Sequence, residues 1–226
     1  EHTYGDTQSL TASVALPPAC IDGSDYCADM RTILLTALAR ALRGLHGGDR
    51  SRILLTGHGR ESVTDSIDVS RTVGWFTSNY PVVLDLGGGT EIRSQISSIE
   101  ETLQAIPKRG IGYGILRYLT PPPLKEDLSF LPAHEISFNY LGRYESGIDD
   151  GLFVFSERMA HSSIGERFER HQALELDAMM TERAVTLYLR YSPRFHPKAT
   201  MERFVDSLRS EVGSLLSHVA AAIDTV

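Results

Sequence analysis

Apolar residues recur every three or four positions in three long stretches of the chain, which is the spacing of an amphipathic helix. These stretches cover residues 28–45, 91–106 and 200–223. The first is rich in Leu, Ala and Arg and is followed by Gly47 and Gly48, and good helix formers followed by glycine predict a helix with a defined end. The pattern therefore predicts three main helices. The small residues of the first suit close packing on a sheet.

Shorter stretches are either alternating apolar and polar or continuously apolar, as strands are. We interpret residues 8–16, 53–55, 82–86, 135–141, 174–180 and 184–191 as strands. Only Thr181, Glu182 and Arg183 separate the last two, which indicates an antiparallel hairpin. Since strands and helices interleave along the chain, we expect an α/β (α+β) fold with a mixed β-sheet flanked by helices.

The segment between the second helix and the fourth strand is rich in glycine and proline. Residues 110–114 predict a turn in which the backbone approaches a neighbour closely, and residues 115–119 a short helix. Pro121, Pro122 and Pro123 are expected to end that helix and to begin a loop that runs to about residue 133.

Composition limits the classes of function. The chain has 226 residues, of which 42% are hydrophobic and 23% charged, as in an ordinary soluble protein of one domain or two small ones. A net charge of -7 argues against a general nucleic-acid binder, and no apolar run approaches the ~20 residues of a membrane-spanning helix. The N-terminus lacks the pattern of a signal peptide. Two cysteines, Cys20 and Cys27, are too few for a disulfide framework, so we expect reduced thiols and a cytoplasmic location.

Groups that could carry chemistry concentrate between Ile53 and Pro81. A short apolar strand ends there in a turn where Gly57 and Gly59 flank His58, and where Arg60 and Glu61 follow. Glycines beside polar groups let the backbone approach a ligand or another segment, and loops after strands often hold functional groups. A structural turn explains the residues equally well: His58 would bond the turn, and Arg60 would pair with Glu61.

Four blocks resemble the epimerization domains of nonribosomal peptide synthetases, which are members of the condensation-domain superfamily. Residues 56–61, TGHGRE, are similar to the family's EGHGRE, and residues 71–81, RTVGWFTSNYP, to RTVGWFTxxYP. Residues 107–114, PKRGIGYG, follow PxxGxGYG, and residues 138–142 read FNYLG. A single block would be a weak signal, but four in the same order are a specific one.

The resemblance implies that residues 1–226 form the C-terminal lobe of a two-lobed, chloramphenicol-acetyltransferase-like fold whose active site lies in a tunnel between the lobes. It implies an aminoacyl or peptidyl thioester substrate, carried on the phosphopantetheine of a peptidyl carrier protein, and no directly bound cofactor. The second partner would be an N-terminal lobe, covalent or in trans. A lobe without that partner is expected to expose apolar surface and to self-associate.

Epimerization removes a proton from the carbon alpha to the thioester and returns it, which needs a base, an acid and donors to the enolate oxygen. In the family, one catalytic group is the second histidine of HHxxxDG on the N-terminal lobe, and the first Glu of EGHGRE is its proposed partner. None of the eight histidines here is followed by that pattern, and Thr56 occupies the position of the Glu. A threonine hydroxyl cannot act as a carboxylate base near neutral pH.

Three hypotheses follow. The chain is an epimerization-type lobe that depends on an N-terminal lobe for the histidine; or it is a degenerate lobe that serves as a docking platform for a carrier protein or a tailoring enzyme; or it is a stand-alone enzyme that uses the cleft for other chemistry. For the first, we expect catalytic roles for His58, Glu61, Asn139 and Tyr140, and substrate contacts for Thr56, Arg60, Trp75, Thr77 and Tyr113.

Several of these residues have structural interpretations as well. Trp75 and Phe76 are expected in the core or in the tunnel wall. Asn139 and Tyr140 lie on opposite faces of a strand, so only a bulge would turn both into one cleft. His161, His171 and His196 lack metal-ligand spacing with any Cys, Asp or Glu, and we predict no metal site.

Overall fold

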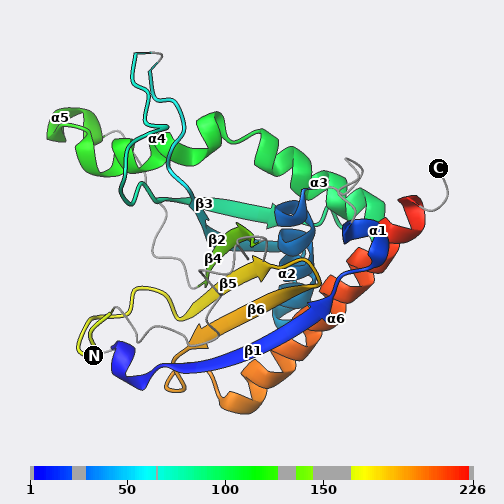
Figure 1. Cartoon of the computed structure of the whole chain (residues 1–226). Helices are drawn as coiled ribbons and strands as arrows, with labels where there is room; N and C mark the ends of the chain where they lie inside the picture. The colour runs from blue at the N-terminus through cyan, green and yellow to red at the C-terminus, as the bar shows by residue number, and fades with distance from the viewer. Residues whose placement is uncertain (1–2, 22–28, 65, 127–135, 145–163, 224–226) are drawn as a thin grey trace, which may run out of the picture.

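The computed structural model describes residues 3–21, 29–64, 66–126, 136–144 and 164–223. Strands and helices alternate along the chain (Figure 1). The strands are β1 (Gln8–Ala15), β2 (Arg50–Gly57), β3 (Ser78–Asp85), β4 (Ile136–Arg143), β5 (Leu174–Met180) and β6 (Ala184–Tyr191). The helices and helical turns are η1 (Tyr4–Asp6), α1 (Pro18–Ile21), α2 (Met30–His46), α3 (Ile92–Gln104), η2 (Pro107–Gly110), α4 (Ile111–Gly114), η3 (Ile115–Leu119), α5 (Pro122–Lys125) and α6 (Lys198–Ile223).

The six strands form one mixed sheet in the order β1-β6-β5-β4-β2-β3. β5 and β6 are the predicted antiparallel hairpin, and β1 extends the sheet as an antiparallel partner of β6. β4 lies between β5 and β2 and is parallel to both, while β3 returns antiparallel to β2. The predicted fold class is therefore confirmed. The strand expected at residues 53–55 is longer, because Ser51 continues the inward alternation of Ile53 and Leu55.

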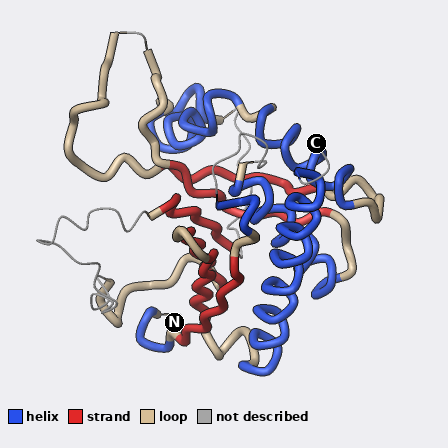
Figure 2. The backbone as a smooth tube through the Cα atoms, turned by 45° about the vertical axis from the view of Figure 1, so that its right-hand side comes forward, coloured by secondary structure: helices blue, strands red, loops and turns tan. Residues whose placement is uncertain are grey.

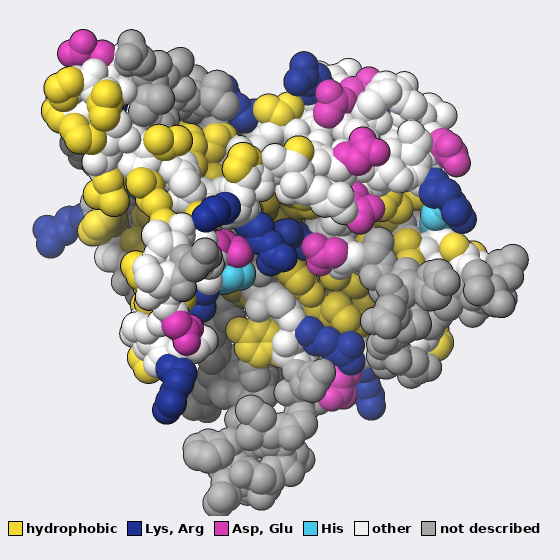
Figure 3. All heavy atoms as spheres, turned by 90° about the horizontal axis from the view of Figure 1, so that it is seen from above, with side chains coloured by type: hydrophobic (Ala, Val, Ile, Leu, Met, Phe, Trp, Pro, Cys, Tyr) yellow, Lys and Arg dark blue, Asp and Glu magenta, His cyan; other side chains and the backbone are white. Residues whose placement is uncertain are grey.

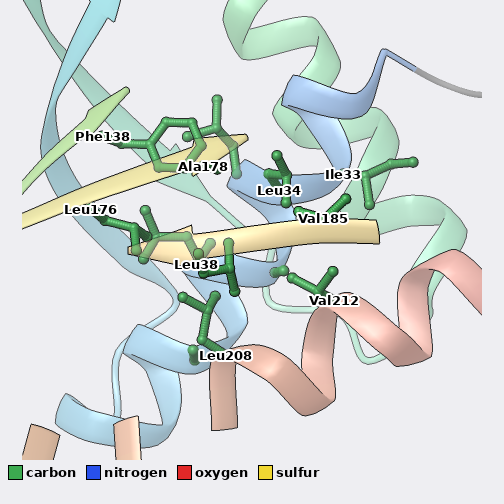
Figure 4. Packing of buried hydrophobic residues seen from close by; sticks show 14 of the residues in the cluster. Ile33, Leu34, Leu38, Phe138, Leu176, Ala178, Val185, Leu208 and Val212 are labelled. Atoms are coloured by element: carbon green, nitrogen blue, oxygen red, sulfur yellow. The ribbon is translucent and has the colours of Figure 1, made fainter. Parts of the chain in front are cut away.

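Helices α2, α3 and α6 lie on one side of the sheet (Figure 2). Alternate strand residues point toward them, and Figure 4 shows Leu176 and Val185 of the sheet facing Leu34 and Leu38 of α2 and Leu208 of α6. All of these side chains are buried. The three helices predicted from apolar periodicity are confirmed, because their stripes are the surfaces that this core removes from water.

The ends of α2 are specified locally. Asp29 caps the N-terminus, where its side chain accepts a hydrogen bond from the backbone N–H of Arg31 at 3.2 Å. Gly47 ends the helix in the left-handed conformation (φ 80°), which glycine adopts without a steric penalty. The expected glycine stop is therefore confirmed. The cap also places Asp29 and Arg31 beside the cleft described below.

The face of the sheet away from these helices is polar. One row of neighbouring residues crosses all six strands in register, from β1 to β3: Thr11, Tyr188, Asp177, Asn139, Thr56 and Asn79. The row brings residues that are 83 positions apart in sequence, Thr56 and Asn139, onto adjacent strands. The sheet thus carries its apolar core on one face and hydrogen-bonding groups on the other.

Two sequence expectations need correction. The prolines do not begin a loop: Pro122 starts the helical turn α5, because proline is well tolerated in the first turn of a helix, where its missing N–H has no partner to lose. Residues 111–114 form a helical turn rather than an open one, although the expected close approach is confirmed at Gly110.

Cys20 is buried, while Cys27 and the later part of the predicted loop lie outside the described residues. None of the described helices is long and apolar enough to cross a lipid bilayer.

Candidate functional site

A cleft of about 760 Å³ opens beside the ends of β2 and β4. A second cavity, of about 880 Å³, adjoins it and shares Thr56 and Thr77. The first cleft brings together six of the nine predicted site residues: Thr56, His58, Trp75, Thr77, Asn139 and Tyr140. Tyr113 lines the second cavity, and the contacts of Arg60 and Glu61 are described below. The sequence blocks at residues 56–61, 71–81 and 138–142 therefore meet at one place.

The parallel pairing of β2 and β4 explains this convergence. Parallel strands run in the same direction, so the groups that follow each strand gather at one edge of the sheet. Thr56 is in register with Asn139 on one side and with Asn79 on the other. The Thr56 hydroxyl donates a hydrogen bond to the Asn79 side-chain oxygen at 3.0 Å. The position of the family's carboxylate thus holds a hydroxyl that already has an acceptor.

Asn139 and Tyr140 both line the cleft, although they are consecutive, regularly paired residues of β4 and no bulge separates them. The register of β4 with β5 shifts between Tyr140 and Arg143, and Gly142 within this stretch has φ 87°. The Tyr140 hydroxyl donates to the thioether sulfur of Met180 at 3.7 Å, which is a weak acceptor. Burial raises the pKa of Tyr140, and the negative charge of Asp29 adds to the rise. A tyrosine phenol is neutral at neutral pH in any case, so the hydroxyl is available as a donor.

His58 has a partner at each ring nitrogen. Its Nδ1 accepts a hydrogen bond from the backbone N–H of Arg60 at 3.0 Å, and its Nε2 lies 3.0 Å from Oε1 of Glu61. Because Nδ1 accepts, the neutral ring carries its proton on Nε2 and donates it to Glu61. The side chain is 60% exposed, as expected for a histidine between glycines. His58 thus bonds its own turn and also lines the cleft.

Arg60 organises the long loop between β2 and β3. Its guanidinium donates to the backbone carbonyls of Val69 (2.9 Å), Thr72 (3.0 Å) and Gly74 (3.2 Å), and it lies 4.3 Å from the centre of the Phe76 ring. The considered ion pair with Glu61 is therefore wrong. The described hydrogen bonds of the Arg60 guanidinium all go to loop carbonyls, while Glu61 faces His58 and, at 3.8 Å, Nη1 of Arg109.

Trp75 is not a core residue. It is 97% exposed, Val73 is 99% exposed, and Gly74 between them has φ 151°. Both residues lie in the β2–β3 loop next to Gly74, whose carbonyl accepts a hydrogen bond from Arg60. Trp75 nevertheless lines the cleft.

Charged residues of the cleft include some that sequence reasoning missed. Asp29 and Arg31 come from the start of α2, Glu100 from α3, and Arg109 from η2. Arg109 lies inside the block at residues 107–114, and that block could have indicated it as a site residue. The other three lie in amphipathic helices or their caps, where no sequence motif distinguishes them from ordinary surface charges. Within the described parts of the chain, no three His, Cys, Asp or Glu side chains gather as a metal site requires, and His161 lies outside them.

The family model described as Condensation domain matches residues 23–226. The chain belongs to the condensation-domain family. It is 40% identical over 217 residues to surfactin synthase subunit 1 of Bacillus subtilis (strain 168), which covers 96% of this chain and 6% of that protein. It is 36% identical over 200 residues to bacitracin synthase 3 of Bacillus licheniformis, covering 88% of this chain and 3% of that protein.

The crystal structure of the epimerization domain from the third module of tyrocidine synthetase B is similar to the whole described fold. The TM-score is 0.88 at 34% identity, and the alignment covers 98% of this condensation-family chain and 50% of that one. The starter condensation domain of rhizomide synthetase matches with a TM-score of 0.59 at 13% identity, which shows the shared fold alone. The chain thus spans about half of each of these two structures, and the resemblance predicted from the four sequence blocks is confirmed.

Proposed function

We propose that the chain forms the C-terminal wall of an epimerization-type domain in nonribosomal peptide synthesis. Its substrate would be an aminoacyl or peptidyl thioester on the phosphopantetheine of a carrier protein. One observation carries the proposal: an epimerization domain matches at 34% identity with a TM-score of 0.88, whereas a condensation domain of the same fold reaches 13% and 0.59.

The described groups suit the stabilisation of an enolate better than the removal of a proton. When a base takes the alpha proton, the electron pair of the C–H bond moves onto the thioester oxygen. The Tyr140 phenol, whose present acceptor is the weakly accepting sulfur of Met180, and the Asn139 amide are donors in the cleft that this oxygen requires. The enolate collapses when a proton returns to the opposite face of the alpha carbon. In this proposal the cleft of this chain holds the oxygen, and the proton-transferring imidazole comes from the other lobe.

Exposed apolar side chains support the proposal that a separate lobe forms the other wall of the cleft. Val73 and Trp75 project from the β2–β3 loop, which Arg60 holds in shape. Leu119 and Leu124 of the η3–α5 segment are 74% and 65% exposed. Figure 3 shows hydrophobic side chains at the surface toward the end of the molecule where α5 lies. A fixed loop that presents a bare tryptophan is suited to bury it against a partner, here the N-terminal lobe.

The test is exchange of the alpha proton. The chain is mixed with a peptidyl carrier protein loaded with a peptidyl thioester, in deuterated buffer, with and without an N-terminal lobe that contains HHxxxDG. We expect deuterium at the alpha position only when both lobes are present. Exchange at the background rate in both mixtures would reject the proposal.

A specific observation favours the second hypothesis, a degenerate lobe used for docking. Thr56 has replaced the carboxylate and its hydroxyl bonds Asn79, and both nitrogens of His58 have partners within the turn. A docking platform predicts saturable binding of carrier proteins or tailoring enzymes without exchange. Flat titrations across all of these proteins would exclude it. No contact in the described residues favours the third hypothesis, a stand-alone enzyme.

A further inference from the structure

The turn η2 contains two residues other than glycine in the left-handed backbone conformation, which is strained for a residue with a Cβ. Lys108 (φ 44°, ψ 40°) and Arg109 (φ 50°, ψ 35°) are the described non-glycine residues with positive φ, and Gly110 follows at φ 83°. Three successive left-handed residues would ordinarily be glycine or asparagine, since a Cβ is crowded in this conformation. Strain of this kind persists where the surrounding contacts fix it, and it often marks a functional position.

The turn packs closely against β3. A Cβ added to Gly110 would lie 2.2 Å from the ring of Tyr80, which is itself buried. The backbone of the turn therefore lies directly on that ring. Such a base fixes where the side chains of the two preceding residues begin.

Both side chains contact the first part of the β2–β3 loop, residues 58–63, which we call its outgoing arm. Lys108 Nζ donates to the carbonyls of Val63 at 3.0 Å and Ser62 at 3.4 Å. Arg109 Nη1 lies 3.8 Å from Oε1 of Glu61, and this same oxygen lies 3.0 Å from Nε2 of His58. The turn is thus connected to the imidazole in the cleft through a single carboxylate oxygen.

We propose that the left-handed turn Lys108–Gly110 is a positioning element, in which Lys108 fixes the loop arm and Arg109 fixes Glu61. The His58 ring then keeps the orientation in which Nδ1 accepts from Arg60 and Nε2 donates to Glu61, and with it one tautomer. In this conformation the turn directs both cations at adjacent points of the loop. Neither residue is proposed to touch the substrate. The relevance to catalysis rests on the proposed function, but the positioning itself is measurable in the 226-residue chain alone.

Nuclear magnetic resonance of the His58 ring tests the role of Arg109. In the wild-type chain we expect two well-separated ¹⁵N shifts, as for a single Nε2–H tautomer. Arg109→Gln should draw the two shifts together as tautomers interconvert, and Arg109→Lys should largely restore the separation. Arg50→Gln is the matched control, because Arg50 pairs with Asp85 at 3.1 Å at the opposite end of the same two strands. Unchanged His58 shifts in a folded Arg109→Gln chain would overturn the proposal.

The variant Lys108→Gly distinguishes the effect of the strained backbone at residue 108 from the effect of the Lys108 side chain. Glycine relieves the left-handed strain, so the melting temperature should stay the same or rise. The loop arm loses its anchor, so the order parameters of the Ser62 and Val63 amides should fall from about 0.85 toward 0.6 or below. Retained order parameters at these two amides would contradict the role of Lys108.

A kinetic experiment connects the turn to the reaction. In the two-lobe exchange assay, Arg109→Gln should lower the maximal exchange rate about tenfold and leave the affinity for the carrier protein unchanged, whereas Arg50→Gln should change neither. Equal rates for Arg109→Gln and the wild type would count against the proposal. If the wild-type chain gives no exchange at all, the proposed function fails, and the ring shifts of His58 still decide the positioning role.

Discussion

Thr56 is the residue at which the cleft departs from the family's EGHGRE motif. The Thr56 side chain lies between Asn79 and Asn139 on adjacent strands, and the side-chain amide of each asparagine can donate a hydrogen bond. A carboxylate at this position would face amide groups that can donate to it. Within the four sequence blocks, the departure from the family's patterns is thus confined to one side chain.

Thr56→Glu should therefore increase catalysis. A positioned general acid or base typically contributes about 10²–10⁴-fold to a rate. We expect the variant to raise alpha-deuterium incorporation in the two-lobe assay at least tenfold, because it supplies the second proton-transfer group. Thr56→Val, which lacks both the hydroxyl and a charge, is the control. A folded Thr56→Glu chain with wild-type exchange would contradict the assignment of this site.

At the scale of elements, the β2–β3 loop depends on close approach between its two arms. Gly59 has φ 65°, and a Cβ placed there would lie 1.4 Å from the backbone oxygen of Phe76. Only glycine allows the outgoing and returning arms to cross at this distance. The Arg60 contacts to Val69, Thr72 and Gly74 depend on that crossing.

Gly59→Ala should destabilise the chain more than Gly88→Ala. Gly88 has nearly the same φ, 69°, and nothing lies within 4 Å of its added Cβ. It therefore measures the cost of left-handed strain alone, about 1–2 kcal/mol. Steric overlap at Gly59 adds about 1–3 kcal/mol or more. Urea unfolding of both variants gives the comparison, and equal losses of unfolding free energy would show that the arms do not pack as described.

Periodicity predicted most elements, and local chemistry accounts for the exceptions. The helices α2, α3 and α6 and the β5–β6 hairpin followed from spacing, because their apolar residues are the ones the core buries. Trp75 could not be placed in this way. It lies in a loop whose backbone is bonded by Arg60, and such contacts leave no periodic pattern in the sequence.

At the scale of the whole molecule, a polar network joins the N-terminal segment to the sheet. The Tyr4 hydroxyl donates to Oε1 of Glu175 at 2.7 Å, and the buried guanidinium of Arg170 lies 3.4 Å from the same oxygen and donates to Thr7 at 3.0 Å. Arg190 donates to the other oxygen of Glu175 at 3.0 Å. The network connects residues more than 160 positions apart.

This network gives the stability a dependence on alkaline pH. Burial, and then the hydrogen bond to Glu175, raise the pKa of Tyr4 from 10.0 to about 12. Folding therefore favours the protonated phenol, and its contribution is complete below pH 10 and is lost as the pH rises toward 12. Tyr80 and Tyr140, whose pKa values burial also raises, act in the same direction.

The measurement is urea unfolding at several pH values from 8 to 12. The wild-type chain should lose unfolding free energy above pH 10, and Tyr4→Phe should be less stable at pH 8 but should lose less over that range. The two curves should therefore converge at high pH. Parallel curves would show that Tyr4 does not titrate with folding.

The exposed apolar groups predict self-association of the isolated chain. Val73 and Trp75 project from a loop that is held in shape, so two copies can bury them against each other. Light scattering should show a mean mass that rises with concentration, and the double variant Val73→Ser, Trp75→Ser should remain closer to the monomer. A monomer at all concentrations would contradict this expectation.

The sequence by itself determined the fold class, the main helices and hairpin, and the family, because those depend on periodicity and on short blocks that each lie within one segment. Only the tertiary structure decided how the blocks meet. The parallel pairing of β2 with β4 places Asn139 next to Thr56, the crossing at Gly59 directs Arg60 into the loop, and the base of Gly110 on Tyr80 brings Arg109 to Glu61. These contacts join residues distant in the chain, and a pattern of neighbouring residues contains no information on which distant groups the sheet will place side by side.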